Sequence, residues 1–164
     1  GNIVFYCVPF TELQEALRDN CPEELFTVLM RRLMVKIANR ICAANDYGAI
    51  ITGESVAQVA SQTLPAIFCT NAAAEYPVFR PVIGMDKREI VGVARHIDTF
   101  GVSTLPYEDC CTVFSPKHPK TRPSLEEILA AEASFDFEPL IEKAVRETEV
   151  KQFKYGVRNV DLDM

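Results

Sequence analysis

Ala49-Ile50-Ile51-Thr52-Gly53-Glu54-Ser55 is the stretch of this sequence that decides the fold. Residues 49–52 form a short apolar run that favours a β-strand, and Gly53 at its end lets a ligand approach the backbone closely. The polar residues that follow are dense for a helix start beside a core strand: Glu54, Ser55, Gln58, Ser61 and Gln62. Because buried polar groups need partners, the set indicates either a binding site or a polar helix cap with an exposed face.

The segments around this stretch alternate between strand and helix. Residues 3–8 are a continuous apolar run, typical of a strand buried on both faces of a parallel sheet. A long helix is predicted from 22 to about 44, with apolar residues at helical spacing: Leu25, Leu29, Leu33, Ile37 and Ile41. Residues 78–84 form a third extended segment, and 87–97 another helix. This order predicts an α/β fold, a parallel sheet with helices on both faces, whose ligand crevice lies beyond the carboxyl ends of the strands.

Local signals define the shorter elements. Capping-box patterns predict three helix starts, at Thr11 with Gln14, Asp86 with Glu89, and Ser124 with Glu127. The other expected segments are a short helix at 55–63, a loop-rich crossover at 64–77, irregular chain at 100–112 and a last helix from 138 to about 148. The stripe of the helix 87–97 that is expected to face the core is Ile90, Val93, Ala94 and Ile97.

The composition argues against several classes of protein. The 164 residues carry a formal charge of −6, which disfavours a strongly basic nucleic-acid module. No apolar run approaches the roughly 20 residues of a membrane helix, and the start lacks a signal-peptide pattern. The seven glycines form neither a G-x-G-x-x-G nor a G-x-x-x-x-G-K loop. Four single cysteines are expected to be small buried hydrophobes in a reducing, cytoplasmic compartment: Cys7, Cys21, Cys42 and Cys69.

Two cysteines, Cys110 and Cys111, are adjacent. They lack the C-x₂₋₄-C spacing of tetrahedral zinc sites, so no metal is predicted, and a disulfide between neighbours would be strained. One reactive thiol with a bystander fits better, because the basic residues in 117–122 could lower a thiol pKa if the loop folds back. The alternative is two inert thiols in a loop.

Basic residues also mark the long helix. Arg32, Lys36 and Arg40 follow one another at i, i+4 and i+8, and we expect such a stripe to be a solvated helix face. Arg31 differs because it lies beside the apolar set and could reach into a crevice. His96 has no catalytic group near it in the sequence and is expected to be a plain surface or core residue.

Four motifs, in order through most of the chain, resemble the tRNA sulfurtransferase family, the 4-thiouridine synthetases that also serve thiamine biosynthesis. They are LMRRLM at 29–34, TGESVAQVASQT at 52–63, RPVIGMDK at 80–87 and LPYEDCCT at 105–112, with Phe135-Asp136-Phe137 fitting as well. The resemblance implies an adenine nucleotide alpha hydrolase-like (PP-loop) fold. It implies that 1–164 is the C-terminal portion of that domain, without its first strand and phosphate loop. Within it, 1–112 would hold the core sheet and helices, and 113–164 a basic loop and the C-terminal helices.

The resemblance also implies site residues and partners. In that family, ATP is used to adenylate a uridine oxygen in tRNA, and a persulfide sulfur delivered by a cysteine desulfurase then displaces AMP. By matching position, Arg31, Gly53 and Gln62 would contact ATP, with Mg²⁺ expected beside it. Cys111 would carry the sulfur, because the residues after it match the family's continuation, while Cys110 stays open since the match needs a one-residue gap. The implied partners are tRNA, held mainly by other domains, a cysteine desulfurase and a second copy in a homodimer, with no membrane.

The family's phosphate loop, a Ser-Gly-Gly-x-Asp-Ser turn, would precede residue 1. Without that loop the phosphates lack their cradle, so we expect that 1–164 alone does not turn over ATP. Two other functions stay open at the level of the sequence. One is another PP-loop tRNA-modifying ATPase of the 2-thiouridylase kind, and the other is a non-catalytic fragment that docks a cysteine desulfurase.

Overall fold

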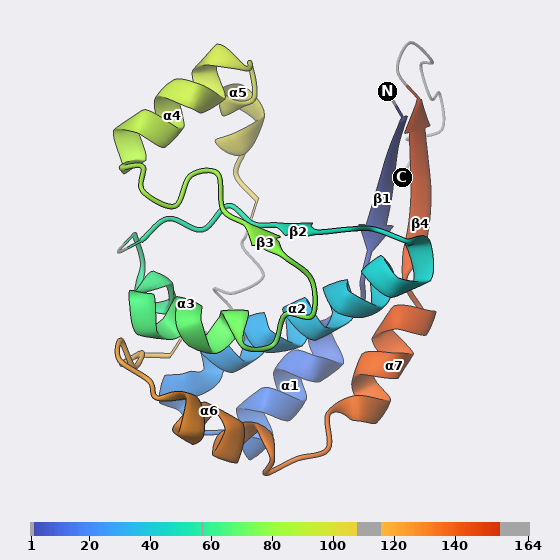
Figure 1. The fold of residues 1–164 in the computed structure, drawn as a ribbon, viewed down its shortest axis with the longest axis vertical. Coiled ribbons are helices and arrows are strands. Elements are labelled where there is room, and N and C mark those ends of the chain that lie inside the picture. Colours follow the sequence, from blue (N-terminus) through green and yellow to red (C-terminus); the bar gives the residue numbers. More distant parts are fainter. Residues whose placement is uncertain (1, 57, 108–115, 155–164) are drawn as a thin grey trace.

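The computed structural model describes residues 2–56, 58–107 and 116–154. A group of helices lies on one side of the molecule, and two separate pairs of strands lie above it (Figure 1). The elements, in chain order, are β1 (Asn2–Cys7), α1 (Thr11–Asn20), a 3₁₀ turn (Glu23–Leu25), α2 (Phe26–Asn45), β2 (Ile50–Ile51), a second 3₁₀ turn (Ala60–Gln62), α3 (Leu64–Asn71), β3 (Val78–Phe79), α4 (Lys87–His96), α5 (Phe100–Ser103), α6 (Leu125–Glu132), α7 (Glu138–Arg146) and β4 (Glu149–Lys154).

Helix α2 is the centre of the hydrophobic core. Leu29 and Leu33 are fully buried, and Leu25 and Ile37 nearly so, as their spacing predicts. Helices α1, α3, α6 and α7 pack against α2 (Figure 1). The side chains that they contribute to the core are Leu13, Leu17, Ala66, Cys69, Ile128, Ile141 and Ala144. The long predicted helix is therefore confirmed.

Strands β2 and β3 form the parallel pair that the sequence predicts. Ile50 pairs with Val78 and Ile51 with Phe79, and the backbone N–H of Thr52 donates to the Phe79 carbonyl (3.0 Å). Helices α2 and α3 lie on one side of this pair and α4 and α5 on the other (Figure 1). The α/β class is confirmed, with a short parallel sheet in the described part of the chain.

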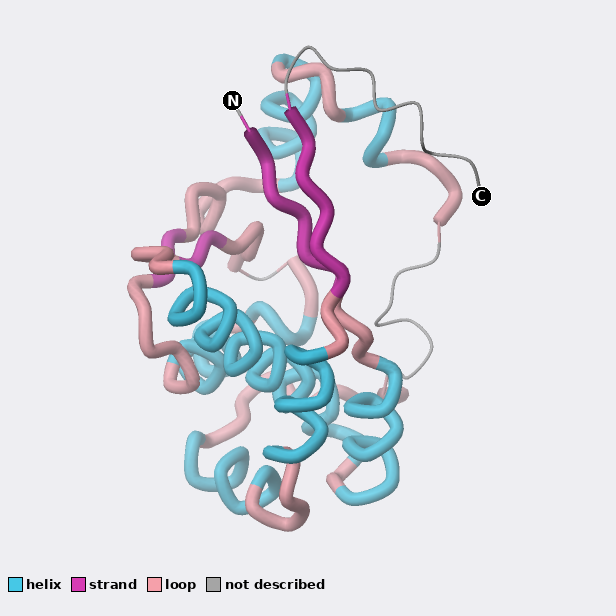
Figure 2. Tube along the Cα trace, turned by 90° about the vertical axis from the view of Figure 1, so that its right-hand side faces the viewer, coloured by secondary structure: helices cyan, strands magenta, loops and turns pink. Residues whose placement is uncertain are grey.

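The interpretation of residues 3–8 as a doubly buried parallel strand is wrong. Strand β1 pairs antiparallel with β4, with Asn2 opposite Lys154 and Cys7 opposite Glu149, and the two form a ribbon that projects from the helices (Figures 1 and 2). The side chain of Ile3 is 65% exposed. An apolar run indicates a strand but not its partner, and residues 149–154 carry no comparable run that would have identified them as the pairing strand.

Several shorter predictions fail for local reasons. The described residues of 55–63 contain a 3₁₀ turn at Ala60–Gln62 rather than the expected helix, and the helix begins instead at Leu64, inside the expected loop. The Thr63 hydroxyl caps it by accepting from the Ala66 N–H (3.3 Å), and Pro65 suits its first turn, so the proline opens a helix here rather than breaking one. Residues 100–112 are not wholly irregular, because α5 occupies Phe100–Ser103.

Two of the three capping boxes form. Asp86 with Glu89, and Ser124 with Glu127, each make both hydrogen bonds of the motif, at the starts of α4 and α6. Thr11 is instead the first residue of α1, and Phe10 precedes it without a side-chain cap. The apolar stripe of α4 is not buried in a core, although it is expected to be: Ile90 and Ala94 are only half-buried, and Ile97, just after the helix, is 59% exposed.

Replacing Ser124 by alanine is expected to lower the free energy of unfolding by about 1 kcal/mol. The Ser124 hydroxyl accepts from the Glu127 N–H (3.2 Å), and α6 delivers Ile128 to the main core, so the loss should appear in global unfolding by urea. Asp86→Ala is the matched control, since α4 buries no side chain. An equal loss in both variants would contradict the link between this cap and the core.

Candidate functional site

The segments that leave β2 and β3 are joined to each other. The Ser55 hydroxyl donates to the Met85 carbonyl (2.7 Å), and the Val56 N–H donates to the Ile83 carbonyl (3.0 Å). Residues 52–56 and 80–85 thus lie against each other beyond the carboxyl ends of the parallel strands, where an α/β fold places its ligands.

Glu54 is the charged centre of this region. Its carboxylate is 3% exposed and accepts hydrogen bonds from Arg80 Nε (2.5 Å), from the Thr52 hydroxyl (2.9 Å) and from Arg31 Nη2. Burial by itself raises the pKa of Glu54, but the hydrogen bond from Arg80 and the charge of Arg31 outweigh it, so the pKa is lowered. Glu54 is therefore ionised at neutral pH, and Arg31 reaches the crevice as its position predicts.

Gln62 closes the turn after β2. Its side-chain oxygen accepts from the backbone N–H of Ser55 (3.0 Å), and Ser55 and Ser61 are buried while Gln58 is exposed. An exposed polar helix face is thus wrong for most of this set, because Glu54 and Ser55 find their partners inside the protein. Gly53 is exposed, and a Cβ atom there would have no atom within 4 Å other than those of its chain neighbours. The backbone at Gly53 is therefore open to approach.

A cavity of about 120 Å³ adjoins Glu54. Its polar lining is Arg31, Thr52, Glu54, Thr70, Asn71 and Arg80. Two guanidinium groups face one carboxylate here, so the cluster keeps one net positive charge, which suits an anion such as a phosphate group. Sites for whole small molecules occupy roughly 300–1,000 Å³, so the cavity fits a part of a nucleotide rather than all of it.

Arg80 is the residue of this cluster to which the sequence assigned no role. It lies in the RPVIGMDK motif directly after β3, but the motif alone does not show that its side chain turns back toward the neighbouring loop. Its Nη1 also donates to Asn71 Oδ1 (3.2 Å) at the end of α3. The signal available in the sequence was its place at a strand end, next to the expected ligand crevice.

The basic stripe on α2 is not a solvated face, so that expectation is wrong. Arg32 is 3% exposed and donates to Glu132 Oε2 (2.6 Å) and to the Cys69 carbonyl (2.6 Å). Lys36 binds the same carboxylate, and Arg40 binds Glu138. These acceptors belong to α3, α6 and α7, about 35 to 100 residues along the chain, so no local pattern could reveal them.

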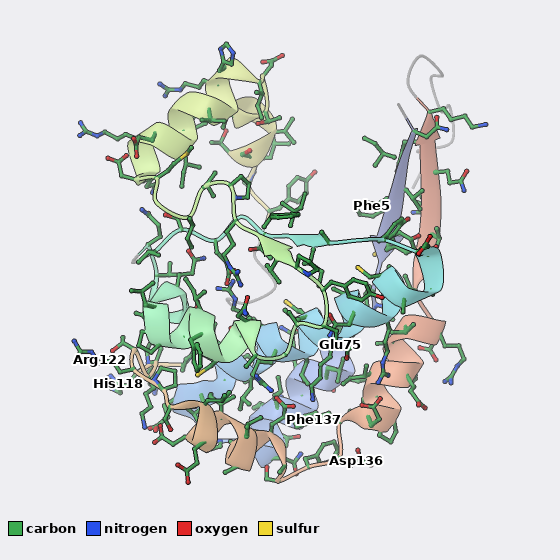
Figure 3. The ribbon with its side chains drawn as sticks, in the orientation of Figure 1. Phe5, Glu75, His118, Arg122, Asp136 and Phe137 are labelled. Atoms are coloured by element: carbon green, nitrogen blue, oxygen red, sulfur yellow. The ribbon has the colours of Figure 1, made fainter. Side chains whose placement is uncertain are left out.

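Cys110 and Cys111 lie outside the described residues. The basic segment that follows them is hydrogen-bonded to the residues just before α2 and α3: the backbone N–H of Lys120 donates to the Glu24 carbonyl (3.0 Å), and the Thr63 hydroxyl donates to the Thr121 carbonyl (2.6 Å). His118 and Arg122 are exposed at the edge of the molecule (Figure 3).

The four single cysteines differ in burial. Cys42 and Cys69 are buried, as expected, and burial raises the pKa of both thiols. Cys21 is half-buried and Cys7 is exposed, because β1 belongs to a two-stranded ribbon that projects from the helices, so the expectation is wrong for Cys7. His96 is a surface residue.

Phe135-Asp136-Phe137 has a structural role. Phe137 is buried in the core, its ring 4.9 Å from that of Phe135, and Asp136 Oδ1 accepts from the Glu138 N–H (3.1 Å) at the start of α7 (Figure 3). No helix in the described part of the chain has the length and apolar character needed to cross a membrane.

Comparisons with known proteins agree on one family. The model of the family described as thiamine biosynthesis protein (ThiI) matches residues 1–137. The "Probable tRNA sulfurtransferase" of Acetivibrio thermocellus is 53% identical over 148 residues, 90% of this chain and 38% of that protein. The protein with the same description from Alkaliphilus metalliredigens is 51% identical over 152 residues, 93% of this chain and 39% of that protein.

A solved structure matches as well. It is described as the "crystal structure of a 4-thiouridine synthetase - RNA complex with bound ATP", has a TM-score of 0.88 and 33% identity, and is matched over 94% of this chain and 40% of that one. The chain thus spans about two fifths of the length of these relatives. Matched by the family model over most of its length, the chain belongs to the ThiI family.

Proposed function

We propose that this chain is the part of an ATP-dependent tRNA sulfurtransferase that carries one side of the nucleotide site and the sulfur-handling thiol. One observation carries the proposal: Arg31 and Gln62, from separate elements, both bind the turn 52–55 that also contains Gly53. These are the residues that the family resemblance assigns to ATP. Relatives of about 50% identity are described as tRNA sulfurtransferases, which does not favour a 2-thiouridylase or a mere docking fragment.

The residues present fit a nucleotide. Arg31 would meet a phosphate group, the open backbone at Gly53 would allow close contact, and Gln62 would keep the turn in shape through Ser55. ATP, with Mg²⁺, supplies activation of the uridine oxygen as a leaving group. Arg31, Gly53 and Gln62 would bind and orient the nucleotide, and a well-placed reactant lowers the barrier to the later attack by sulfur.

The thiol side of the reaction belongs to Cys111, with Cys110 as the alternative. A persulfide carried there, loaded by a cysteine desulfurase, would attack the activated carbon of the base with its outer sulfur and displace AMP. A thiol reductant would then cleave the sulfur–sulfur bond, which leaves the outer sulfur on the base. Lys117 and Arg122 follow this cysteine pair and are exposed, whereas Lys120 pairs with Glu127, so this segment would contact the tRNA backbone only locally. Most of the contacts that bind tRNA, and any homodimer contact, would lie elsewhere in the longer protein.

A chimera tests the proposal. In it, the matched 148-residue segment of the Acetivibrio thermocellus protein is replaced by the corresponding residues of this chain. We expect the chimera to form 4-thiouridine in tRNA when ATP, Mg²⁺, cysteine, a cysteine desulfurase and a thiol reductant are supplied, as measured by mass spectrometry of digested tRNA. If the unmodified relative is active and the folded chimera is not, the proposal fails.

Arg31→Ala in the chimera is expected to weaken ATP binding at least roughly tenfold, the usual cost of losing a charge-assisted contact. Titration calorimetry with ATP measures the change in Kd. Arg40→Ala is the matched control, because Arg40 lies on the same helix but pairs with Glu138, away from the crevice. Equal weakening by both variants would contradict a direct role for Arg31.

A further inference from the structure

Among the described residues, two carboxylates with little exposure to solvent each bind two basic side chains. Glu54 accepts from Arg31 and Arg80, whereas Glu132 accepts from Arg32 and Lys36. Both clusters begin at the same turn of α2, because Arg31 and Arg32 are neighbours. They differ in place, since Glu132 lies among the helices and Glu54 lies beyond the carboxyl ends of β2 and β3. The second cluster is therefore a built-in structural control for the first.

The Glu54 cluster is fixed mainly through Arg80. Arg80 Nε donates to Glu54 Oε2 (2.5 Å), and its Nη1 donates to Asn71 Oδ1 (3.2 Å) and to the Val78 carbonyl (3.5 Å). Arg80 is thus bound to α3, to β3 and to the turn after β2. Arg31 is tied to the other oxygen of the same carboxylate. Because both arginines bind the same carboxylate, Arg80 restrains Glu54, and Glu54 in turn restrains the guanidinium of Arg31.

We propose that Glu54 is a positioning residue for nucleotide binding: anchored by Arg80, it holds Arg31 in place to receive a phosphate group. This inference rests on the proposed function. Arg31 is 19% exposed and borders the cavity, so an unheld side chain could turn to solvent and would lose rotamer freedom on binding. Holding the guanidinium beforehand removes that cost from the binding step.

The direction in which Glu54→Gln changes the Kd for ATP distinguishes a positioning role from a purely electrostatic one. A carboxylate repels phosphate, so a purely electrostatic role predicts that Glu54→Gln tightens ATP binding. A positioning role predicts the opposite, because an amide accepts two guanidinium groups poorly and leaves them to repel each other. We expect the Kd for ATP to rise roughly tenfold.

The deciding measurement is ATP titration of the chimera by calorimetry. Glu132→Gln, which removes the same charge from the control cluster, is expected to change the Kd by less than about twofold. When Arg31 is already alanine, adding Glu54→Gln should change the Kd for ATP by less than about twofold, because Glu54 then has no Arg31 side chain to hold and the effects of coupled residues do not add. If Glu54→Gln does not fold, Thr52→Val removes one hydrogen bond to Glu54 without changing charge, and should raise the Kd roughly threefold.

A second measurement needs no nucleotide. In ¹⁵N NMR spectra of the 164-residue chain, Glu54→Gln should speed solvent exchange of the Arg80 Nε–H, and Glu132→Gln that of the Arg32 Nε–H, each without affecting the other. The positioning role is wrong if Glu54→Gln leaves the Kd for ATP unchanged or lowers it. It is also wrong if Glu54→Gln raises the Kd roughly tenfold even when Arg31 is already alanine. Either result leaves the proposed function standing. Failure of the unmutated chimera to bind ATP, while the relative binds it, overturns both.

Discussion

Replacing Cys111 by serine in the chimera is expected to abolish the formation of 4-thiouridine, lowering its rate by roughly a thousandfold or more, as removal of a covalent nucleophile commonly does. A serine hydroxyl cannot hold a persulfide, so no sulfur reaches the activated base. ATP binding should stay unchanged, because the residues proposed for it lie on α2 and in the turn after β2. Mass spectrometry of tRNA digests and calorimetry with ATP measure the two properties separately.

Cys110→Ser is the matched control, one residue away and with the same change of atom. It is expected to retain most of the sulfur transfer. Reversed results would assign the sulfur to Cys110, the alternative that the one-residue gap leaves open. If neither single variant loses activity, the assignment of a sulfur-handling thiol to this pair is wrong. Labelling of the persulfide with an alkylating probe, followed by peptide mapping, identifies the loaded cysteine directly.

Some short-range signals in the sequence predicted the structure correctly, although the capping box at Thr11 and the helix at 55–63 did not form. The capping boxes at Asp86 and Ser124 and the apolar spacing of 25–41 depend on residues three or four apart, and each defines its element. The parallel pairing of β2 with β3 follows from the alternation of strand and helix. The crevice could be predicted for the same reason, because it lies where these strands end.

Pairings between distant residues could not be predicted. Strand β1 is paired with residues 149–154, and its sequence shows only that it is a strand. Arg31 and Arg32 differ by one position, or about 100° around the helix, yet one reaches the crevice and the other enters the helical core. What separates their roles is the position of Glu54 and Glu132, which depends on the tertiary fold.

Replacing Arg32 by leucine is expected to lower the free energy of unfolding by about 3 kcal/mol. Glu132 is 11% exposed, and its pKa is lowered because the hydrogen bonds from Arg32 and Lys36 outweigh the cost of burial. Without Arg32, Lys36 is the one basic partner that the described residues leave to this carboxylate, and the Cys69 carbonyl loses a donor at 2.6 Å. Urea unfolding of the 164-residue chain, followed by circular dichroism, measures the shift in midpoint.

Two further variants separate a buried ion pair from a general loss of charge. Arg40→Leu removes a cation from the same stripe, but Arg40 is 35% exposed and Glu138 47%, so the expected loss is below about 1 kcal/mol. The double variant Arg32→Leu/Glu132→Leu should recover most of the stability, because apolar side chains can replace a buried ion pair once neither charge is left alone. Lys36, 33% exposed, can then turn to water. If Arg32→Leu lowers the free energy of unfolding no more than Arg40→Leu does, the basic stripe on α2 behaves as a solvated face. Glu132 could then no longer serve as the structural counterpart of Glu54.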